Sequence, residues 1–178
     1  DLNQKAVVKA QDITSDIQLF GNRIYTAEGK GGIGVYEISD NGLSLTKISS
    51  YLYNNDGDNY PVSVVRLSPN ANFVLCDSGS MVAELVDFRD INNPVSFKRT
   101  RLGGLYYARQ ASNGAPVANR YLCIYDHLKN VQWYDFGEDN GNDPVYFTRL
   151  KSLGMYSGLT SVGDKALVSL KGQYVIFD

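Results

Sequence analysis

The sequence contains few of the residues that build cross-linked, metal-binding or membrane-spanning proteins. Its 178 residues include only 2 Cys, 2 Met, 5 Pro, 1 Trp and 1 His. A disulfide-dense scaffold needs more cysteine, and a zinc centre needs more than one imidazole ligand or a set of thiolates. No apolar run approaches the ~20 residues of a membrane-spanning helix, so membrane insertion is not expected.

The charges of the chain are close to balance. There are 17 Lys and Arg against 19 Asp and Glu, a formal net charge of −2. A chain without a basic excess has no global electrostatic attraction to nucleic acid or to an anionic membrane surface. We therefore expect neither as a partner. The length and the 43% hydrophobic content predict a single domain over residues 1–178.

The chain does contain a repeated motif of two apolar residues followed by an acid. The four copies are Val35-Tyr36-Glu37, Leu85-Val86-Asp87, Trp133-Tyr134-Asp135 and Ile176-Phe177-Asp178. Successive acids are 50, 48 and 43 positions apart, which is the length of one blade of a β-propeller. No stretch of about 11 residues keeps the 3.6-residue apolar period of a helix. The pattern therefore predicts an all-β fold.

Each repeat divides into short runs rich in aromatic and β-branched residues, separated by Gly, Asn and Asp, as strands require. First strands are predicted at residues 13–20, 61–68, 105–111 and 156–162. Second strands are predicted at 23–27, 73–76, 120–125 and 165–170, and fourth strands at 43–49, 95–102 and 145–153. The third strand of each repeat ends in the motif. The last repeat lacks a fourth strand.

The missing strand is predicted to come from the N-terminus, where Gln4–Ala10 shares the character of the other fourth strands. An unpaired strand leaves open hydrogen-bonding groups at a sheet edge, and pairing this segment with the last blade removes that edge. We therefore predict a four-bladed β-propeller closed by the N-terminal strand. The alternative is four blades of a larger propeller. A β-sandwich would not account for the matched motifs.

The two cysteines, Cys76 and Cys123, fall at matching places in two successive repeats. A disulfide requires Cα atoms within roughly 7 Å of each other, and matching positions in neighbouring blades lie farther apart. We therefore predict two buried thiols that fill equivalent core sites.

Two stretches resemble the LVIVD-type repeat of secreted bacterial β-propellers. They are residues 21–40, with Gly-Asn, Ile-Tyr-Thr-Ala and Gly-Gly-Ile-Gly-Val-Tyr-Glu-Ile-Ser-Asp in turn, and residues 86–95, Val-Asp-Phe-Arg-Asp-Ile-Asn-Asn-Pro-Val. The third and fourth repeats depart from the pattern because they lack the Asn-Pro turn. The resemblance implies blades and an exported, extracellular or cell-surface location. It implies no particular reaction, because such proteins mostly have no assigned activity.

Three acids occupy matching hairpin positions between second and third strands, counted back from the motif acids. They are Glu28, Asp77 and Asp126, with Ser169 in the last repeat. Carboxylates around one channel mouth are suited to hold a hard cation such as Ca²⁺ or to serve as an acid/base pair for glycoside hydrolysis. Alternatively, they cap hairpin turns and face water.

Two arginines in the first strands are the second candidate group. Arg66 and Arg109 align with Gln18 and Thr160 at one polar position near the channel. Paired guanidinium groups can grip a carboxylate, sulfate or phosphate. The alternative is an internal role, in which they neutralise buried acids such as Asp77 or Asp87.

The loop at residues 54–59 has the oxygen density of a cation-binding turn, with Asp56 and Asp58 as candidate Ca²⁺ ligands. It lacks the distal Glu of an EF-hand loop, so a solvated turn is the competing interpretation. His127 is the single histidine, follows Asp126 in a hairpin loop, and is a further candidate for ligand binding at the loop face. No Gly-x-Ser-x-Gly elbow accompanies it, which argues against nucleophilic catalysis.

Tyrosines gather in the connections between blades, among them Tyr60 and Tyr107. A tyrosine offers a flat apolar face and one hydroxyl to a sugar or a protein. Packing at blade junctions is the alternative role.

Together these features favour a non-catalytic, exported binding or interaction module that recognises a glycan or a protein through one loop face and requires no cofactor. Two alternatives stay open. One is a carbohydrate-active hydrolase that uses the channel acids and needs a convergent carboxylate pair, one with a raised pKa. The other is a purely structural module of a larger protein.

Overall fold

The computed structural model describes residues 6–55, 58–77, 82–101, 113–117, 120–125, 131–137, 143–150, 156–170 and 173–177. Within these ranges every regular element is a strand, and all strand pairs are antiparallel. The all-β prediction is confirmed. No helix in this part of the chain is long and apolar enough to cross a membrane.

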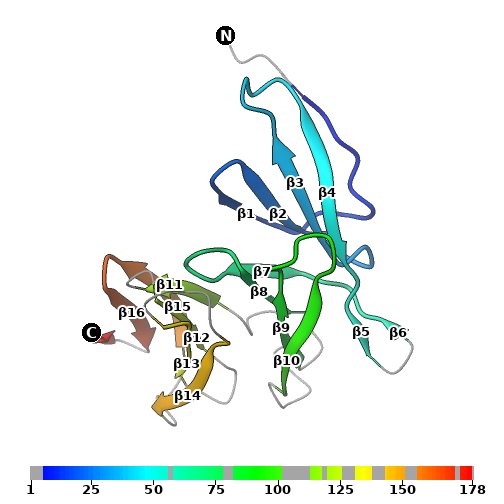
Figure 1. Ribbon diagram of the computed structural model, residues 1–178. Coiled ribbons are helices and arrows are strands. Elements are labelled where there is room, and N and C mark those ends of the chain that lie inside the picture. Colours follow the sequence, from blue (N-terminus) through cyan, green and yellow to red (C-terminus); the bar gives the residue numbers. More distant parts are fainter. Residues whose placement is uncertain are drawn as a thin grey trace.

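The strands form consecutive sheets, which we call blades 1 to 4 (Figure 1). Blade 1 contains β1 (Asp16–Phe20), β2 (Arg23–Ala27), β3 (Ile33–Ile38) and β4 (Leu45–Tyr51). Blade 2 contains β7 (Val64–Leu67), β8 (Phe73–Asp77), β9 (Val82–Asp87) and β10 (Val95–Arg101). Blade 3 contains β11 (Asn113–Val117), β12 (Tyr121–Tyr125), β13 (Val131–Asp135) and β14 (Val145–Leu150). Blade 4 contains β15 (Tyr156–Val162), β16 (Lys165–Leu170) and β17 (Gln173–Phe177), and β5 (Asn54–Asn55) with β6 (Asp58–Asn59) forms a small hairpin between blades 1 and 2.

The blades follow one another in chain order around their innermost strands. Strand β1 lies against β7, β7 against β11, and β11 against β15. Within each blade the chain runs outward, so that β4, β10 and β14 are the outer strands. Figure 1 shows this sequence as a turn from blade 1 at the top, through blades 2 and 3, to blade 4 at the left. The repeat length predicts this arrangement, in which the inner strand of each blade contacts the inner strand of the next.

The first strand of blade 3 differs from its prediction. We expected residues 105–111, which lie outside the described residues, whereas the structure places β11 at Asn113–Val117. The segment reads Asn-Gly-Ala-Pro-Val, a poor strand former by propensity. It is nevertheless paired with β12 along its whole length, including Pro116 opposite Leu122. Proline is tolerated there because β11 is the edge strand of its sheet.

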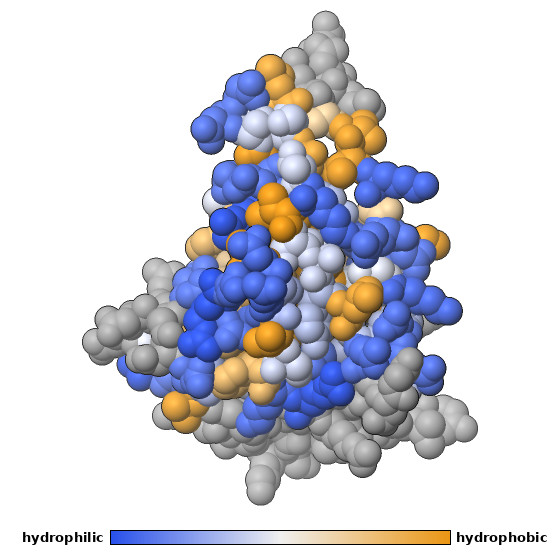
Figure 2. Space-filling view, turned by 45° about the vertical axis from the view of Figure 1, so that its right-hand side comes forward, coloured by the Kyte–Doolittle hydropathy of each residue, from blue (hydrophilic) through white to orange (hydrophobic). Residues whose placement is uncertain are grey.

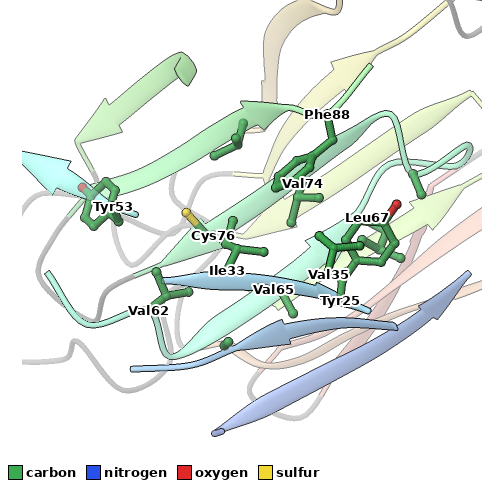
Figure 3. Close-up of a cluster of buried hydrophobic side chains, with 13 residues drawn as sticks. Tyr25, Ile33, Val35, Tyr53, Val62, Val65, Leu67, Val74, Cys76 and Phe88 are labelled. Carbon is green, nitrogen blue, oxygen red and sulfur yellow. The ribbon is translucent and has the colours of Figure 1, made fainter. Parts of the chain in front are cut away.

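The largest core lies between blades 1 and 2 (Figure 3). One face of blade 1 contributes Tyr25, Ala27, Ile33 and Val35, and the facing side of blade 2 contributes Val65, Leu67, Val74, Cys76, Val86 and Phe88. The rings of Tyr25 and Phe88 meet edge to face, with centroids 6.1 Å apart. Each fully buried aliphatic side chain of this kind stabilises the fold by about 1.5–3 kcal/mol.

A second core lies between blades 2 and 3. The opposite face of blade 2 contributes Phe73, Leu75, Ala83 and Leu85, and blade 3 contributes Tyr134 and Phe136. Phe73 and Phe136 stack at a tilt, with ring centroids 5.2 Å apart. Blade 2 is therefore packed on both faces. Its strand β8 is buried throughout as a result.

Two acids of the repeated motif, Asp87 and Asp135, end their third strands and bind arginines. Asp87 binds Arg89, with Nη2 of the arginine 2.5 Å from Oδ2. Asp135 binds Arg120 through two hydrogen bonds of 2.7 and 2.8 Å. Hydrogen bonds from Arg120, the largest effect, hold the pKa of Asp135 below its ordinary value. Both acids also accept the backbone N–H two residues on, an Asx turn that stops the strand.

The predicted match between the two cysteines is wrong by one residue. Strand pairing sets Leu75 opposite Leu85, and Cys123 opposite Trp133, at the same place relative to the motif acids. Cys123 is therefore the equivalent of Leu75 and not of Cys76. Because successive strand residues point to opposite faces, the two cysteines belong to different faces of their blades. Cys76 itself is buried and free, and burial, the largest effect, raises its thiol pKa well above the ordinary value.

The predicted N-terminal strand is not formed over residues 6–10, and residues 4 and 5 lie outside the described residues. The sheet of blade 4 has the order β15-β16-β17, without a fourth strand among the described residues. The segment that follows is held by blade 1 instead. The backbone N–H of Gln11 donates to Glu28 Oε2 at 3.0 Å, and that of Lys30 donates to Asp12 Oδ2 at 2.9 Å. Closure of the ring by this strand stays a prediction.

Candidate binding face formed by the hairpin loops

Two loops at one end of blades 1 and 2 are fastened together by backbone hydrogen bonds. One is the β2–β3 hairpin at residues 28–32, and the other is the connection from β4 to β7, which carries the β5–β6 hairpin. Gly29 N donates to Val62 O at 3.1 Å, and Val62 N donates to Gly29 O at 2.8 Å. The predicted loop face is therefore a joined structure and not a set of separate turns.

The β2–β3 hairpin is shaped by glycine where it passes the end of β4. Gly32 has a φ of +78°, a conformation that L side chains rarely adopt. A Cβ at this position would lie 2.0 Å from the carbonyl oxygen of Tyr51. The close approach excludes any other residue. In the same hairpin, Glu28 N donates a hydrogen bond to Gly32 O.

Glu28, the first candidate acid, is completely buried and fully engaged. Its Oε1 accepts hydrogen bonds from Tyr36 Oη and, at 2.8 Å, from Thr26 Oγ1. Its Oε2 accepts from Gln11 N, and Lys47 Nζ lies 3.3 Å from the same oxygen. Burial acts to raise the pKa of this carboxyl, but the hydrogen bonds and the lysine outweigh it and lower the pKa below the ordinary value. Glu28 is thus held as a structural carboxylate.

The partners of Glu28 are adjusted to its charge. Burial first, and then the bond to Glu28, raise the pKa of Tyr36 well above the ordinary value for a phenol. Tyr36 therefore stays a hydrogen-bond donor throughout the physiological range. Lys47 lies beside the same ring, with its Nζ 5.5 Å from the ring centroid, and adds a cation–π contact.

Blade 2 contains a second buried carboxylate, Glu84 in β9, which the sequence interpretation missed. Its Oε1 accepts hydrogen bonds from Tyr51 Oη at 3.1 Å, from Arg99 Nε at 2.8 Å and from Ser96 Oγ. Its Oε2 is buried without a hydrogen-bond partner. Burial, followed by the charge of Glu84, raises the pKa of Tyr51 to about 12.

The two buried carboxylates occupy equivalent places in their blades. Counted from the motif acids Glu37 and Asp87, the equivalent of Glu84 in blade 1 is Gly34. A Cβ on Gly34 would lie 2.2 Å from Glu28 Oε1. The Glu28 carboxylate therefore fills the space that a side chain at position 34 would take. Gly34 and Glu84 each stand directly before the three-residue motif. Extending the aligned motif by one residue toward the N-terminus would have shown that blade 1 has glycine where blade 2 has glutamate.

Asp77, the second candidate acid, is also buried, with 2% of its surface exposed. Strand pairing places it opposite Ala83, which makes it the equivalent of Ala27 in blade 1. The predicted match with Glu28 is therefore wrong by one residue, because Asp77 lies 10 residues before its motif acid and Glu28 lies 9 before, while the two hairpins have the same length. Neither Glu28 nor Asp77 is splayed into solvent.

Arg66 is engaged within the protein by a partner other than the predicted Asp77 or Asp87. It pairs opposite Leu75 as Gln18 pairs opposite Tyr25, so the predicted alignment of these two positions is confirmed. Its Nη1 forms an ion pair with Asp16 Oδ2, and the same oxygen accepts Val65 N at 3.1 Å. The partner acid is thus Asp16 of β1, not Asp77 or Asp87. The pair joins the inner strands of blades 1 and 2.

The β5–β6 hairpin is anchored by tyrosines and bears polar residues on its exposed part. Tyr53 is buried, and its ring centroid lies 5.9 Å from that of the half-buried Tyr60. Arg99 stacks 5.6 Å from the Tyr53 centroid and donates to Asn54 O at 2.5 Å. Asp58 is exposed at the hairpin. Tyr60 therefore supports the hairpin by packing, the alternative that the sequence left open.

The remaining predicted site residues lie outside the described residues. They are Asp56, Tyr107, Arg109, Asp126 and His127. The structure therefore does not test whether they join the loop face. Among the residues that it does describe, no cluster of three or more His, Cys, Asp and Glu side chains is arranged to hold a metal ion.

Comparison with known proteins supports the architecture. No family model and no curated protein matches the sequence. Solved structures do match. The β-propeller domain of Cps50 (Swd1) from Myceliophteria thermophila is 10% identical and has a TM-score of 0.50, covering 88% of this chain and 49% of its own. The chain is thus similar to a β-propeller, and it spans about half the length of that domain.

Two further solved structures are more distant in shape. Hsv2 from Kluyveromyces lactis is 12% identical with a TM-score of 0.44, and the match covers 90% of this chain and 66% of Hsv2. A putative 6-phosphogluconolactonase from Bacteroides fragilis is 14% identical with a TM-score of 0.36, over 91% of this chain and 65% of that chain. Both matches extend over nearly the whole of this chain.

Proposed function

We propose that this chain is a non-catalytic binding or interaction module, with the loop face of blades 1 and 2 as its recognition surface. The observation that carries the proposal is the state of Glu28. Its two carboxylate oxygens are taken up by Tyr36, Thr26, Lys47 and the backbone of Gln11. A carboxylate held in this way stabilises the hairpin beneath a surface, and it is not free to exchange protons with a substrate.

The hydrolase alternative receives less support for the same reason. Glycoside hydrolysis needs two carboxyl groups facing one substrate, one of them with a raised pKa. The pKa of Glu28 is lowered by its partners, and Asp77 is buried, with 2% of its surface exposed. Arg66, a candidate to grip an anionic ligand, is bound to Asp16.

The β5–β6 hairpin is the part of this face best suited to contact a partner. Its base is fixed by Tyr53, Tyr60 and Arg99, and its exposed residues are polar. Sugar binding commonly uses aromatic rings that lie open to the ligand. Here the tyrosine rings pack internally. We therefore favour a protein or peptide partner, with a glycan as the alternative.

Three finer points belong to the same proposal. The resemblance to LVIVD-type repeats supports an exported protein, extracellular or at the cell surface. The blades form either a ring of four, closed by Gln4–Ala10, or part of a larger propeller. A purely structural role within a larger protein is the alternative to binding.

Selection from a displayed peptide library, alongside a glycan array, tests the proposal. We expect peptide ligands that lose at least tenfold in affinity when Asp58 is replaced by Ala. The matched control is Asp40→Ala, an exposed acid in the turn between β3 and β4. Ligands that respond equally to both substitutions would contradict the assignment of the face.

Hydrolysis of a panel of aryl glycosides tests the alternative. Under the proposal no turnover is expected, and Asp77→Asn has no effect because there is no activity to lose. Turnover that disappears with Asp77→Asn, in a variant with an unchanged melting temperature, would establish the hydrolase instead.

A further inference from the structure

The side of blade 1 that faces away from blade 2 carries apolar residues equivalent to those with which blade 2 packs on blade 1. The inner strands β1 and β7 pair with their neighbours in the same register, which makes Ile17 the equivalent of Val65 and Leu19 the equivalent of Leu67. Val65 and Leu67 are 0% and 7% exposed, because blade 1 covers them. Ile17 and Leu19 are 58% and 65% exposed. We call the face around Ile17 and Leu19 the leading face.

Blade 4 carries the complementary face without a cover. Tyr174 and Ile176 of β17 are the equivalents of Ile33 and Val35 of β3, because both pairs lie opposite the second strand in the same register. Ile33 and Val35 are 0% exposed against blade 2. Tyr174 and Ile176 are 76% and 62% exposed. We call this the trailing face.

These two faces are the two halves of the contact that already joins blade 1 to blade 2. Figure 2 shows hydrophobic patches between hydrophilic residues on the upper part of the molecule, where Figure 1 places blade 1. Apolar side chains exposed on both ends of a run of blades mark an interaction surface. The leading face fits a blade that presents a surface like the trailing face of blade 4.

We propose that this occupant is a second copy of the chain. Blade 4 of each copy packs on blade 1 of the other, so that leading and trailing faces meet twice in a two-copy ring. A head-to-tail contact of this kind forms a closed ring when its rotation closes. Two copies with four blades each make eight, which lies within the range of known propellers.

The length of the arc favours a second copy over closure within one chain. The four blades match 49% of a β-propeller domain, over 88% of this chain. The leading face and the trailing face are both exposed in this structure. A second half-ring covers both with one kind of contact.

The same contact completes the sheet of blade 4. Strand β17 is an edge without a partner on its outer side among the described residues. Residues 6–10 lead into blade 1 beside the leading face, and their side chains alternate between half-buried and exposed, as in a strand. In the two-copy ring this segment lies where β17 of the other copy needs a fourth strand, so the edge is covered.

Light scattering after size exclusion, over a hundredfold range of concentration, measures the mass of the full chain. We expect the mass of two chains, with dissociation at low concentration. The paired substitutions Ile17→Lys with Leu19→Lys, or Tyr174→Lys with Ile176→Lys, should weaken association at least tenfold. The control, Val95→Lys with Val145→Lys, changes valines that are 56% and 65% exposed on the outer strands, and it should leave the mass unchanged.

Mixing the two weakened variants distinguishes the specific contact from general stickiness. One leading face and one trailing face stay intact in the mixture, so it should associate more tightly than either variant alone. A single-chain mass at every concentration would overturn the proposal, as would a control as weakened as the test variants.

Crosslinking separates the second copy from closure within one chain. Ile17→Cys and Ile176→Cys in separate chains should form a mixed disulfide-linked dimer when combined and oxidised. If instead a single chain with both substitutions crosslinks only to itself, the ring is closed by four blades and the two-copy proposal is wrong.

Discussion

Blades 1 and 2 both bury a glutamate carboxylate at the same place in their sheets, but they take it from different positions in the chain. Blade 2 uses Glu84 within β9, whereas blade 1 has Gly34 there and fills the space with Glu28 from the hairpin. Each carboxylate meets a tyrosine hydroxyl and a cation. The comparison teaches that the geometry of the blade preserves a polar contact, while the residue that supplies the acid can change.

The largest expected effect comes from removing the cation that binds Glu84, and the loss of the cation that binds Glu28 is the comparison. Arg99→Ala should lower the free energy of unfolding by about 3 kcal/mol, because it leaves the buried Glu84 with two hydroxyl donors. Lys47→Ala should cost about 1 kcal/mol, because Glu28 keeps three donors, including Gln11 N. Urea unfolding of both variants measures the difference. Equal losses would show that the two carboxylates are supported in the same way.

A smaller effect is expected from exchanging the source of the acid in blade 1. Gly34→Ala places a methyl group where Glu28 Oε1 lies and should cost about 2 kcal/mol by overpacking. The double variant Gly34→Glu with Glu28→Ala reproduces the arrangement of blade 2. It should recover most of the stability that Gly34→Glu and Glu28→Ala lose as single substitutions. Glu28→Ala alone is the control. A double variant as unstable as the sum of its parts would break the equivalence.

Alkaline unfolding tests the tyrosines that serve the two acids. The unfolded phenol releases its proton near pH 10, whereas folded Tyr51 keeps it to about pH 12. Between these values the unfolded state binds fewer protons, so stability falls as pH rises. Tyr51 should account for about 1 kcal/mol of this loss at pH 11. Urea unfolding of Tyr51→Phe at pH 9 and pH 11 should show a shallower decline than the parent chain.

The smallest effect is a labelling rate without a change in stability. Cys76 is buried and its thiol pKa is raised, so it should react with a maleimide only after denaturation. Cys123 stands where blade 2 has the buried Leu75, and we expect it to be protected in the same way. Rapid labelling of either cysteine in the folded chain would contradict the assignment of its face.

Much of the fold could be predicted because strand patterns are local. The second strands of blades 1 and 4 have their predicted bounds, and the first strand of blade 4 does as well. The position shared by Gln18, Arg66 and Thr160 was predicted, because each lies opposite a residue that pairs with the first residue of the motif. Alternating side chains make such matches reliable when the turns have equal length.

The errors arose where two positions matched as equivalent differ by one residue in their distance from the motif acid. Asp77 lies 10 residues before its motif acid whereas Glu28 lies 9 before, and Cys76 lies 11 before whereas Cys123 lies 12 before. Such a shift moves a side chain to the other face of the sheet. The hairpins themselves have one length, because Arg23, Phe73 and Tyr121 each pair with the motif acid 14 residues later. Strand β11 was misplaced for a different reason, because Asn-Gly-Ala-Pro-Val has little strand propensity and is held by its pairing with β12.

The sequence by itself determined the class of the fold, the spacing of the blades and the acids that end the third strands. These depend on contacts between residues near one another in the chain. Only the tertiary structure decided that Glu28 fills the place of a missing side chain at Gly34, and that Asp16 of blade 1 is the partner of Arg66 of blade 2. Both contacts join residues whose proximity is set by the packing of sheets, since a buried charge accepts whichever partner the packing brings within reach.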